Sequence, residues 1–258
     1  MKKKSNTKKY ILIISVAALL IAGLAIGLTQ AKYKTEKIMP GKVRFTASLA
    51  EGLKIQEHRA ERNGDGSYTL VHDDITNDSG EVTVPAVVQE QEYKLMPGVD
   101  VPKDPFITVQ GKTNIPGWLF VEIDDSEMPE EVTYAVRTAE GATDEDPGYW
   151  IDTGLTGQYG KIYVYYKQLV TADTQQGTGD DVELTEFYIL AADARDNTLT
   201  VSQTLKRTTN AGLDFYASLC QAITEPATAE GASAPTDAAI AAAAAADYTT
   251  CFGTTNQG

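Results

Sequence analysis

Two histidines are the residues whose type best suits metal chemistry in this 258-residue chain, which holds no others. His58 follows Glu57, and His72 precedes Asp73 and Asp74, so nitrogen and carboxylate donors adjoin each other in the sequence. The histidines are fourteen positions apart and lack the His-Glu-x-x-His pattern, whereas a catalytic zinc usually takes three protein ligands. We therefore expect no zinc-dependent catalysis and no cofactor; a weak adventitious metal site is the alternative.

Other motifs that carry chemistry are incomplete. Gly111-Lys112-Thr113 resembles the end of a phosphate-binding loop, but the earlier glycine of that motif is missing. Acidic clusters at residues 144–146, at 180–181 and at 193 with 196 lack the spacing of a calcium-binding EF-hand. Solvated loops are the expected role of these clusters, with calcium binding as the alternative. The sequence predicts that the protein is not an enzyme.

The only cysteines are Cys220 and Cys251, near the end of the chain. A disulfide between them would close a loop of about 30 residues and constrain the unfolded chain by roughly 3–4 kcal/mol. Two free thiols are the alternative, and the sequence favours neither state.

The first 31 residues predict export. Five lysines precede an uncharged stretch over residues 10–28, and small side chains follow at Thr29 and Ala31. We expect cleavage after Ala31, so that the exported chain begins at Lys32. A permanent anchor is the alternative, because 19 residues can span a bilayer of about 30 Å as a helix. Either way, we expect a secreted protein of the extracellular matrix or cell surface, with membrane contact only through an uncleaved segment.

Removal of this segment would make the chain strongly acidic. The segment contains five of the 22 basic residues and none of the 36 acidic ones, so the remainder carries a net charge of about −19. Nucleic acid is excluded as a partner, because a polyanion would be repelled and no basic stripe offers a local exception.

An apolar period of two dominates the rest of the chain. Val43, Phe45 and Ala47 alternate with polar neighbours, as do Leu213 and Phe215. The strand candidates are 43–49, 68–71, 106–110, 118–123, 132–137, 162–166, 186–190, 198–202 and 213–219. Turn-forming clusters separate them, and no long amphipathic helix precedes residue 230. We expect an all-β fold, specifically an antiparallel, jelly-roll-like β-sandwich.

The composition changes after Thr224. Residues 225–236 are rich in Pro, Ala, Thr, Gly and Ser and indicate a linker; residues 237–246, nearly all alanine, predict a helix of about ten residues with Thr236 as its N-cap. Ile240 would be its one large apolar contact, and a disordered tail is the alternative. The predicted organisation is a signal peptide at 1–31, a β-sandwich domain with an N-terminal donor-type segment at 32–224, and a linker with a C-terminal helix at 225–258.

Two stretches carry a resemblance to a known family. They are YKLMPGVDVPKDPFITV over residues 93–109 and NIPGWLFVEI over residues 114–123. Together with the lysine-rich leader and GKVRFTASL over residues 41–49, they resemble the TasA/camelysin family of bacterial biofilm-matrix proteins. The resemblance implies fibre formation, processing by a SipW-like signal peptidase and contact with other matrix proteins. It also brings a zinc-peptidase classification, which the histidine spacing does not support.

Two classes of function follow. The favoured one is a structural fibre subunit in which Lys32 to Lys42 completes a neighbour's sheet by β-strand donation. Trp118 and Phe120 offer a further subunit surface, although burial between two layers is the ordinary explanation of a strand that is apolar on both faces. The expected assembly residues are Lys32, Tyr33, Val43, Phe45, Trp118 and Phe120. The alternative is a monomeric acidic surface protein that binds host or partner ligands, and a metallopeptidase ranks third.

Overall fold

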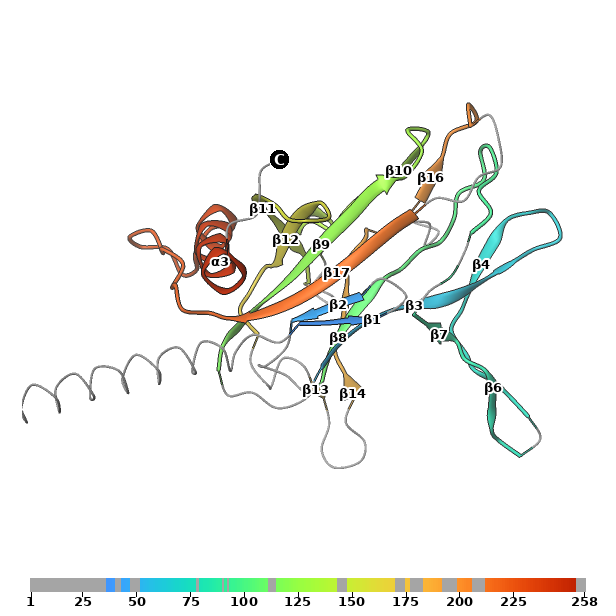
Figure 1. Cartoon of the computed structure of the whole chain (residues 1–258), viewed down its shortest axis with the longest axis horizontal. Helices are drawn as coiled ribbons and strands as arrows, with labels where there is room; N and C mark the ends of the chain where they lie inside the picture. The colour runs from blue at the N-terminus through green and yellow to red at the C-terminus, as the bar shows by residue number, and fades with distance from the viewer. Residues whose placement is uncertain are drawn as a thin grey trace, which may run out of the picture.

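The described part of the chain is mostly β-strand, in curled and largely antiparallel sheets, with one short C-terminal α-helix (Figure 1). The computed structural model describes residues 36–39, 43–46, 52–77, 79–89, 91, 93–110, 115–142, 148–169, 175–176, 183–191, 199–205 and 212–253. The all-β class expected from the alternating pattern is confirmed.

The larger sheet has six strands in the order β1-β2-β17-β9-β12-β11. The strands are β1 (Glu36–Met39), β2 (Val43–Thr46), β9 (Gly117–Glu127), β11 (Trp150–Thr156), β12 (Lys161–Tyr165) and β17 (Gly212–Gln221). The two long strands, β9 and β17, run antiparallel side by side through its middle (Figure 1). β2 pairs with β17 in parallel, so the strand pair β1–β2 lies at one edge of this sheet.

The second sheet has five strands, in the order β15-β8-β3-β4 with β7 also paired to β3. The strands are β3 (Gly52–Arg62), β4 (Tyr68–Val71), β7 (Val87–Val88), β8 (Phe106–Gln110) and β15 (Glu186–Tyr188).

Three short antiparallel pairs, one 3-10 turn and a C-terminal helix complete the described secondary structure. The pairs are β5 (Ile75–Thr76) with β6 (Val82–Val84), β10 (Val132–Tyr134) with β16 (Leu199–Val201), and β13 (Gln175–Gln176) with β14 (Glu183–Leu184); the turn is η1 (Ala139–Gly141). The β5–β6 hairpin projects from the body of the molecule (Figure 1).

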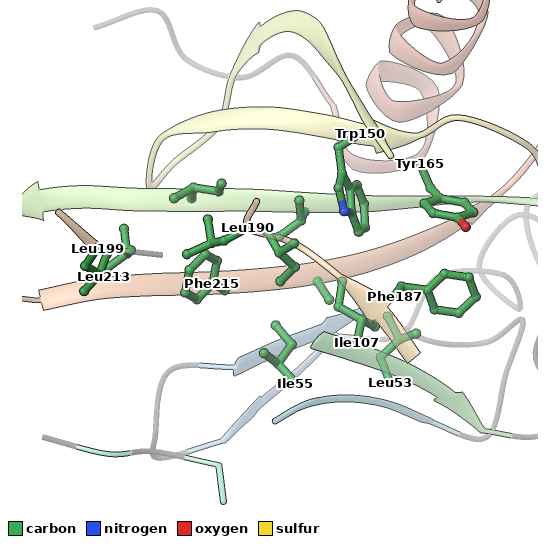
Figure 2. Close-up of a cluster of buried hydrophobic side chains, with 14 of the residues drawn as sticks. Leu53, Ile55, Ile107, Trp150, Tyr165, Phe187, Leu190, Leu199, Leu213 and Phe215 are labelled. Atoms are coloured by element: carbon green, nitrogen blue, oxygen red, sulfur yellow. The ribbon is translucent and has the colours of Figure 1, made fainter. Parts of the chain in front are cut away.

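The main hydrophobic core lies between the two sheets. Figure 2 shows Leu53, Ile55 and Ile107 of β3 and β8 facing Leu213 and Phe215 of β17. The alternation that predicted these strands is what places their apolar side chains on one face. Central strand β9 is buried on both faces, because Leu119, Val121 and Ile123 join this core while Trp118 and Phe120 face the other way.

The helix α3 (Asp237–Phe252) covers that other face. Thr236 caps it as predicted, its Oγ1 accepting a hydrogen bond from the Ala239 amide at 3.3 Å. The predicted length of ten residues is wrong: α3 has sixteen residues, because the helical spacing of its buried positions continues past the alanines to Asp247 and Tyr248. The buried side of α3 consists of Ile240, Ala243, Ala244, Asp247 and Tyr248. Among the helices of the described residues, none is long and apolar enough to cross a membrane.

Candidate functional site: the edges of the six-stranded sheet

An N-terminal hairpin forms one edge of the six-stranded sheet. β1 pairs antiparallel with β2, with Lys37 opposite Phe45, and β2 pairs in parallel with β17, with Phe45 opposite Ala217 and Thr46 opposite Ser218. Part of the predicted donor segment is therefore the outermost strand of the chain's own sheet.

The structure places the predicted assembly residues of the N-terminal segment only in part. Val43 and Phe45 belong to β2, whereas Lys32 and Tyr33 lie outside the described residues, as do the predicted leader and the Ala31 cleavage point.

β17 supplies the surface on which this hairpin rests. Its side chains alternate between buried and half-buried, with Leu213, Phe215, Ala217 and Leu219 directed into the main core. Its other edge is fully occupied by β9 over the pairs from Gly212 to Gln221. Without the hairpin, the outer edge of β17 would present unpaired backbone donors and acceptors, which are a template for another strand.

The opposite edge of the sheet, β11, is built differently. Its pairing with β12 is irregular between Asp152 and Thr156, where Gly154 adopts a positive φ of 72°. The Gly154 amide donates to Asp152 Oδ1 at 2.8 Å, and the Leu155 amide donates to Thr153 Oγ1 at 3.2 Å. Local side chains therefore satisfy these amides, and the irregular edge is poorly suited to accept a further strand.

Trp118 and Phe120 lie beneath α3 and are each 1% exposed. The Phe120 ring meets the Tyr248 ring edge to face at 4.9 Å, and Trp118 Nε1 donates to Asp247 Oδ2 at 3.0 Å. With α3 docked, these two aromatic side chains form an internal contact and no outer surface.

Asp247 is a residue that the sequence analysis did not single out. Its carboxylate is 2% exposed and, besides Trp118, accepts from the Ile223 amide at 2.8 Å and the Thr224 amide at 3.0 Å. Thr224 Oγ1 donates to its second oxygen at 2.7 Å. The sequence does offer one indication. Asp247 is an acidic residue far from the N-terminus of an alanine-rich helix, a position at which a negative charge does not stabilise the helix.

The two histidines lie together. The rings of His58 on β3 and His72 after β4 have centroids 4.8 Å apart. His58 also contacts Asp104, whose Oδ2 lies 2.7 Å from His58 Nδ1 and whose Oδ1 accepts from the His58 amide at 3.0 Å. Nothing in the sequence marks Asp104 as the partner of His58, because 46 positions separate the two residues.

Two of the three acidic residues beside the histidines, Glu57 and Asp74, are engaged elsewhere. Glu57 is buried and pairs with Lys103 at 2.9 Å, and Asp74 Oδ1 accepts from the Ala86 amide at 2.6 Å. Within the described ranges, no three His, Cys, Asp or Glu side chains are grouped so as to hold a metal ion. The acidic clusters at 144–146, 180–181 and 193 with 196, and the Gly111-Lys112-Thr113 motif, lie outside those ranges.

Cys220 and Cys251 are brought together in the cluster beneath α3, and neither forms a disulfide in this structure. A hydrogen bond with Cys251 and burial together raise the pKa of the Cys220 thiol.

No protein-family model, curated protein or solved structure matches the chain.

Proposed function

We propose that this protein is an exported structural subunit of extracellular-matrix or surface fibres and that it assembles by β-strand donation. The observation that carries the proposal is the contrast between the two edges of the six-stranded sheet. One edge is an N-terminal hairpin attached to β17 by a short parallel register, and the other is an irregular strand with satisfied amides.

Exchange of this hairpin between subunits would conserve its contacts. The β1–β2 hairpin of one subunit replaces that of the next on β17, so the same main-chain hydrogen bonds form between chains. Each subunit then has one donor and one acceptor, and the contact is head-to-tail. A head-to-tail contact whose rotation does not close generates a filament.

The fold and the leader support the same proposal. Two sheets that share one core suit a jelly-roll-like sandwich, which we infer as the finer architecture. Cleavage after Ala31 would free the segment that leads into β1. The resemblance to TasA/camelysin proteins also favours a matrix protein, while the spacing of the two histidines argues against the peptidase classification that comes with that resemblance.

A cross-linking experiment tests donation directly. Both native cysteines are replaced by alanine, then Thr46→Cys is made in one chain and Ser218→Cys in another, since these positions are opposite in the parallel register. The two chains are mixed before assembly and oxidised in the fibres. Strand donation predicts covalent dimers that contain one chain of each kind, because neither chain can form this bond alone.

The matched control replaces Ser218→Cys with Asp214→Cys. Residue 214 lies on the same face of β17 but four positions along, about 13 Å away. Mixed dimers are expected with position 218 and not with position 214. Fibres in which neither pair cross-links would rule out donation through β2.

A deletion tests the same proposal without cysteines. Removing residues 32–46, which contain both β1 and β2, should leave a folded monomer that cannot elongate fibres, as judged by circular dichroism and electron microscopy. Replacing the same fifteen residues with a glycine–serine stretch controls for chain length. Elongation by the deleted chain at the normal rate and fibre diameter would place the contact elsewhere, and α3 removal with exposure of Trp118 and Phe120 would be tested next.

A monomeric surface protein that binds a partner is the second candidate. Its supporting observation is the projecting β5–β6 hairpin, on which Ile75 and Val82 are 47% and 52% exposed (Figure 1). Dispersed globules in electron micrographs of secreted material, in place of fibres, would favour this candidate.

A further inference from the structure

The last turn of α3 lies over the C-terminal end of β17. Cys220 on β17 is directly opposite Trp118 on β9, and directly opposite residues of an antiparallel pair share one face of the sheet. Trp118 in turn donates its indole hydrogen bond to Asp247, one helical turn before Cys251. The pairing of β17 with β9 and the spacing of residues along α3 therefore bring Cys220 and Cys251 into contact.

The two thiols differ in access. Cys220 is 0% exposed and belongs to the hydrophobic cluster under α3, whereas Cys251 is half-buried at the margin of that cluster. The thiols are hydrogen-bonded to each other. A reagent in solution therefore reaches Cys251 first, and Cys220 is placed to react with whatever forms there.

We infer that Cys220 and Cys251 are an oxidisable pair and that a disulfide between them fastens α3 to β17. The oxidant is a disulfide, either a small molecule or a thiol–disulfide oxidoreductase. The Cys251 thiolate attacks one sulfur of that disulfide and releases the first thiolate. Cys220 then loses its proton to water, attacks Cys251 Sγ and releases the second. Two protein thiols are oxidised to one disulfide, and the oxidant is reduced to two thiols.

The covalent bond would change how firmly the helix is held. Of the side chains that α3 buries, only Ile240, Asp247 and Tyr248 are larger than alanine, and residues 225–236 before it are mostly exposed. A disulfide closes the loop that contains both this exposed segment and the helix, so it limits the conformations open to them on unfolding. It also keeps Trp118 and Phe120 covered. The inference does not rest on fibre assembly.

Thiol counting and thermal unfolding test the inference on the full wild-type chain. The chain is purified with a reductant, transferred to oxidised glutathione, and analysed by free-thiol titration and by mass spectrometry of non-reduced peptides. The expected result is a fall from two free thiols to none, a peptide pair that joins residues 220 and 251, and a rise in Tm of about 5–15 °C that the reductant reverses.

A second measurement requires no oxidation. Brief alkylation of the reduced, folded chain should label Cys251 in preference to Cys220, and labelling of Cys220 should appear only with denaturant. The Cys251→Ser variant serves as the control, and its Tm should not respond to oxidised glutathione. Retention of both thiols, a stable glutathione adduct on Cys251, or equal labelling of the two thiols in the native chain would each overturn the inference.

Discussion

At the scale of single residues, Asp247 joins three separate segments: the helix that carries it, β9 through Trp118, and the chain after β17 through Ile223 and Thr224. Asp247→Ala would leave the buried indole N–H of Trp118 without an acceptor, together with three part-buried donors, the Ile223 amide and the amide and hydroxyl of Thr224. We expect the free energy of unfolding to fall by about 2–3 kcal/mol, measured by denaturant titration.

The matched control for this prediction is Glu230→Ala, which removes an exposed carboxylate from the preceding segment. Its effect should stay within about 0.5 kcal/mol. Asp247→Asn should be intermediate, since an amide keeps one acceptor oxygen. Equal stability of Asp247→Ala and Glu230→Ala would show that the carboxylate does not anchor the helix.

Tyr149 connects the N-terminal end of α3 to the sheet and makes a pH-dependent contribution to the stability of the fold. Its hydroxyl donates to Asp237 Oδ1 at 2.9 Å, and burial, assisted by this hydrogen bond, raises the pKa of Tyr149 to about 12. The folded-state pKa lies above the value of 10.0 for an unperturbed tyrosine. The contribution to stability is therefore complete below pH 10 and is lost as the pH rises through 12.

We expect Tyr149→Phe to remove this part of the alkaline loss of stability while leaving the folded structure intact. Unfolding curves collected at several alkaline pH values measure it, alongside tyrosinate absorbance of the native chain. Two parallel stability curves for wild type and variant over this range would contradict the assignment.

Several residue-scale contacts were beyond sequence reasoning for a common reason. The contacts of His58 with Asp104 and of Trp118 with Asp247 join residues 46 and 129 positions apart. Nothing local marks such pairs, because each side chain satisfies its hydrogen bonds only after the sheets and the helix have packed. For the same reason, the sequence alone does not establish that Cys220 and Cys251 are adjacent.

At the scale of elements, the alanine-rich surface of α3 permits close approach to the sheet. Ala244 is fully buried between α3 and the six-stranded sheet, whereas Ala246 on the same helix is exposed. Ala244→Leu would force the helix away from its contacts, and we expect a loss of about 1–3 kcal/mol in the free energy of unfolding.

Ala246→Leu adds the same side chain on the solvent side and is the matched control, with an expected change within about 0.5 kcal/mol. Chemical denaturation measures both variants. A helix that tolerates leucine equally at the two positions would not be packed as described.

Strands with clean alternation were predictable, and those with a charged inward residue were not. The predicted ranges 68–71 and 106–110 coincide with β4 and β8. The eleven-residue β3 was missed, because after Leu53 and Ile55 its third inward position is Glu57, whose charge interrupts the apolar period. The ion pair with Lys103 and a hydrogen bond from the Tyr93 hydroxyl at 3.3 Å, both from distant segments, make that burial acceptable.

At the scale of the whole molecule, charge should control the rate of self-association. The chain without its first 31 residues carries about −19, so subunits repel one another at neutral pH and low salt. We expect fibre growth to accelerate when salt screens this repulsion or when acid protonates carboxylates. Light scattering over a salt series measures the rate, with sucrose as an uncharged control. A growth rate independent of salt and pH would argue against direct contact between these acidic subunits.

The parallel pairing of β2 with β17 also determines when the N-terminal hairpin can join its sheet. The partner of Thr46 is Ser218, so the N-terminal hairpin cannot complete its own sheet until nearly the whole chain is available. On the proposed export route, β1 and β2 reach the outside of the cell first and wait there for β17. A finished subunit already at the surface holds a formed β17 throughout that interval. The newly exported β2 can therefore pair with β17 of a neighbouring subunit before β17 of its own chain has been exported. Secretion itself would then favour growth of a fibre over formation of a monomer whose β2 pairs with its own β17.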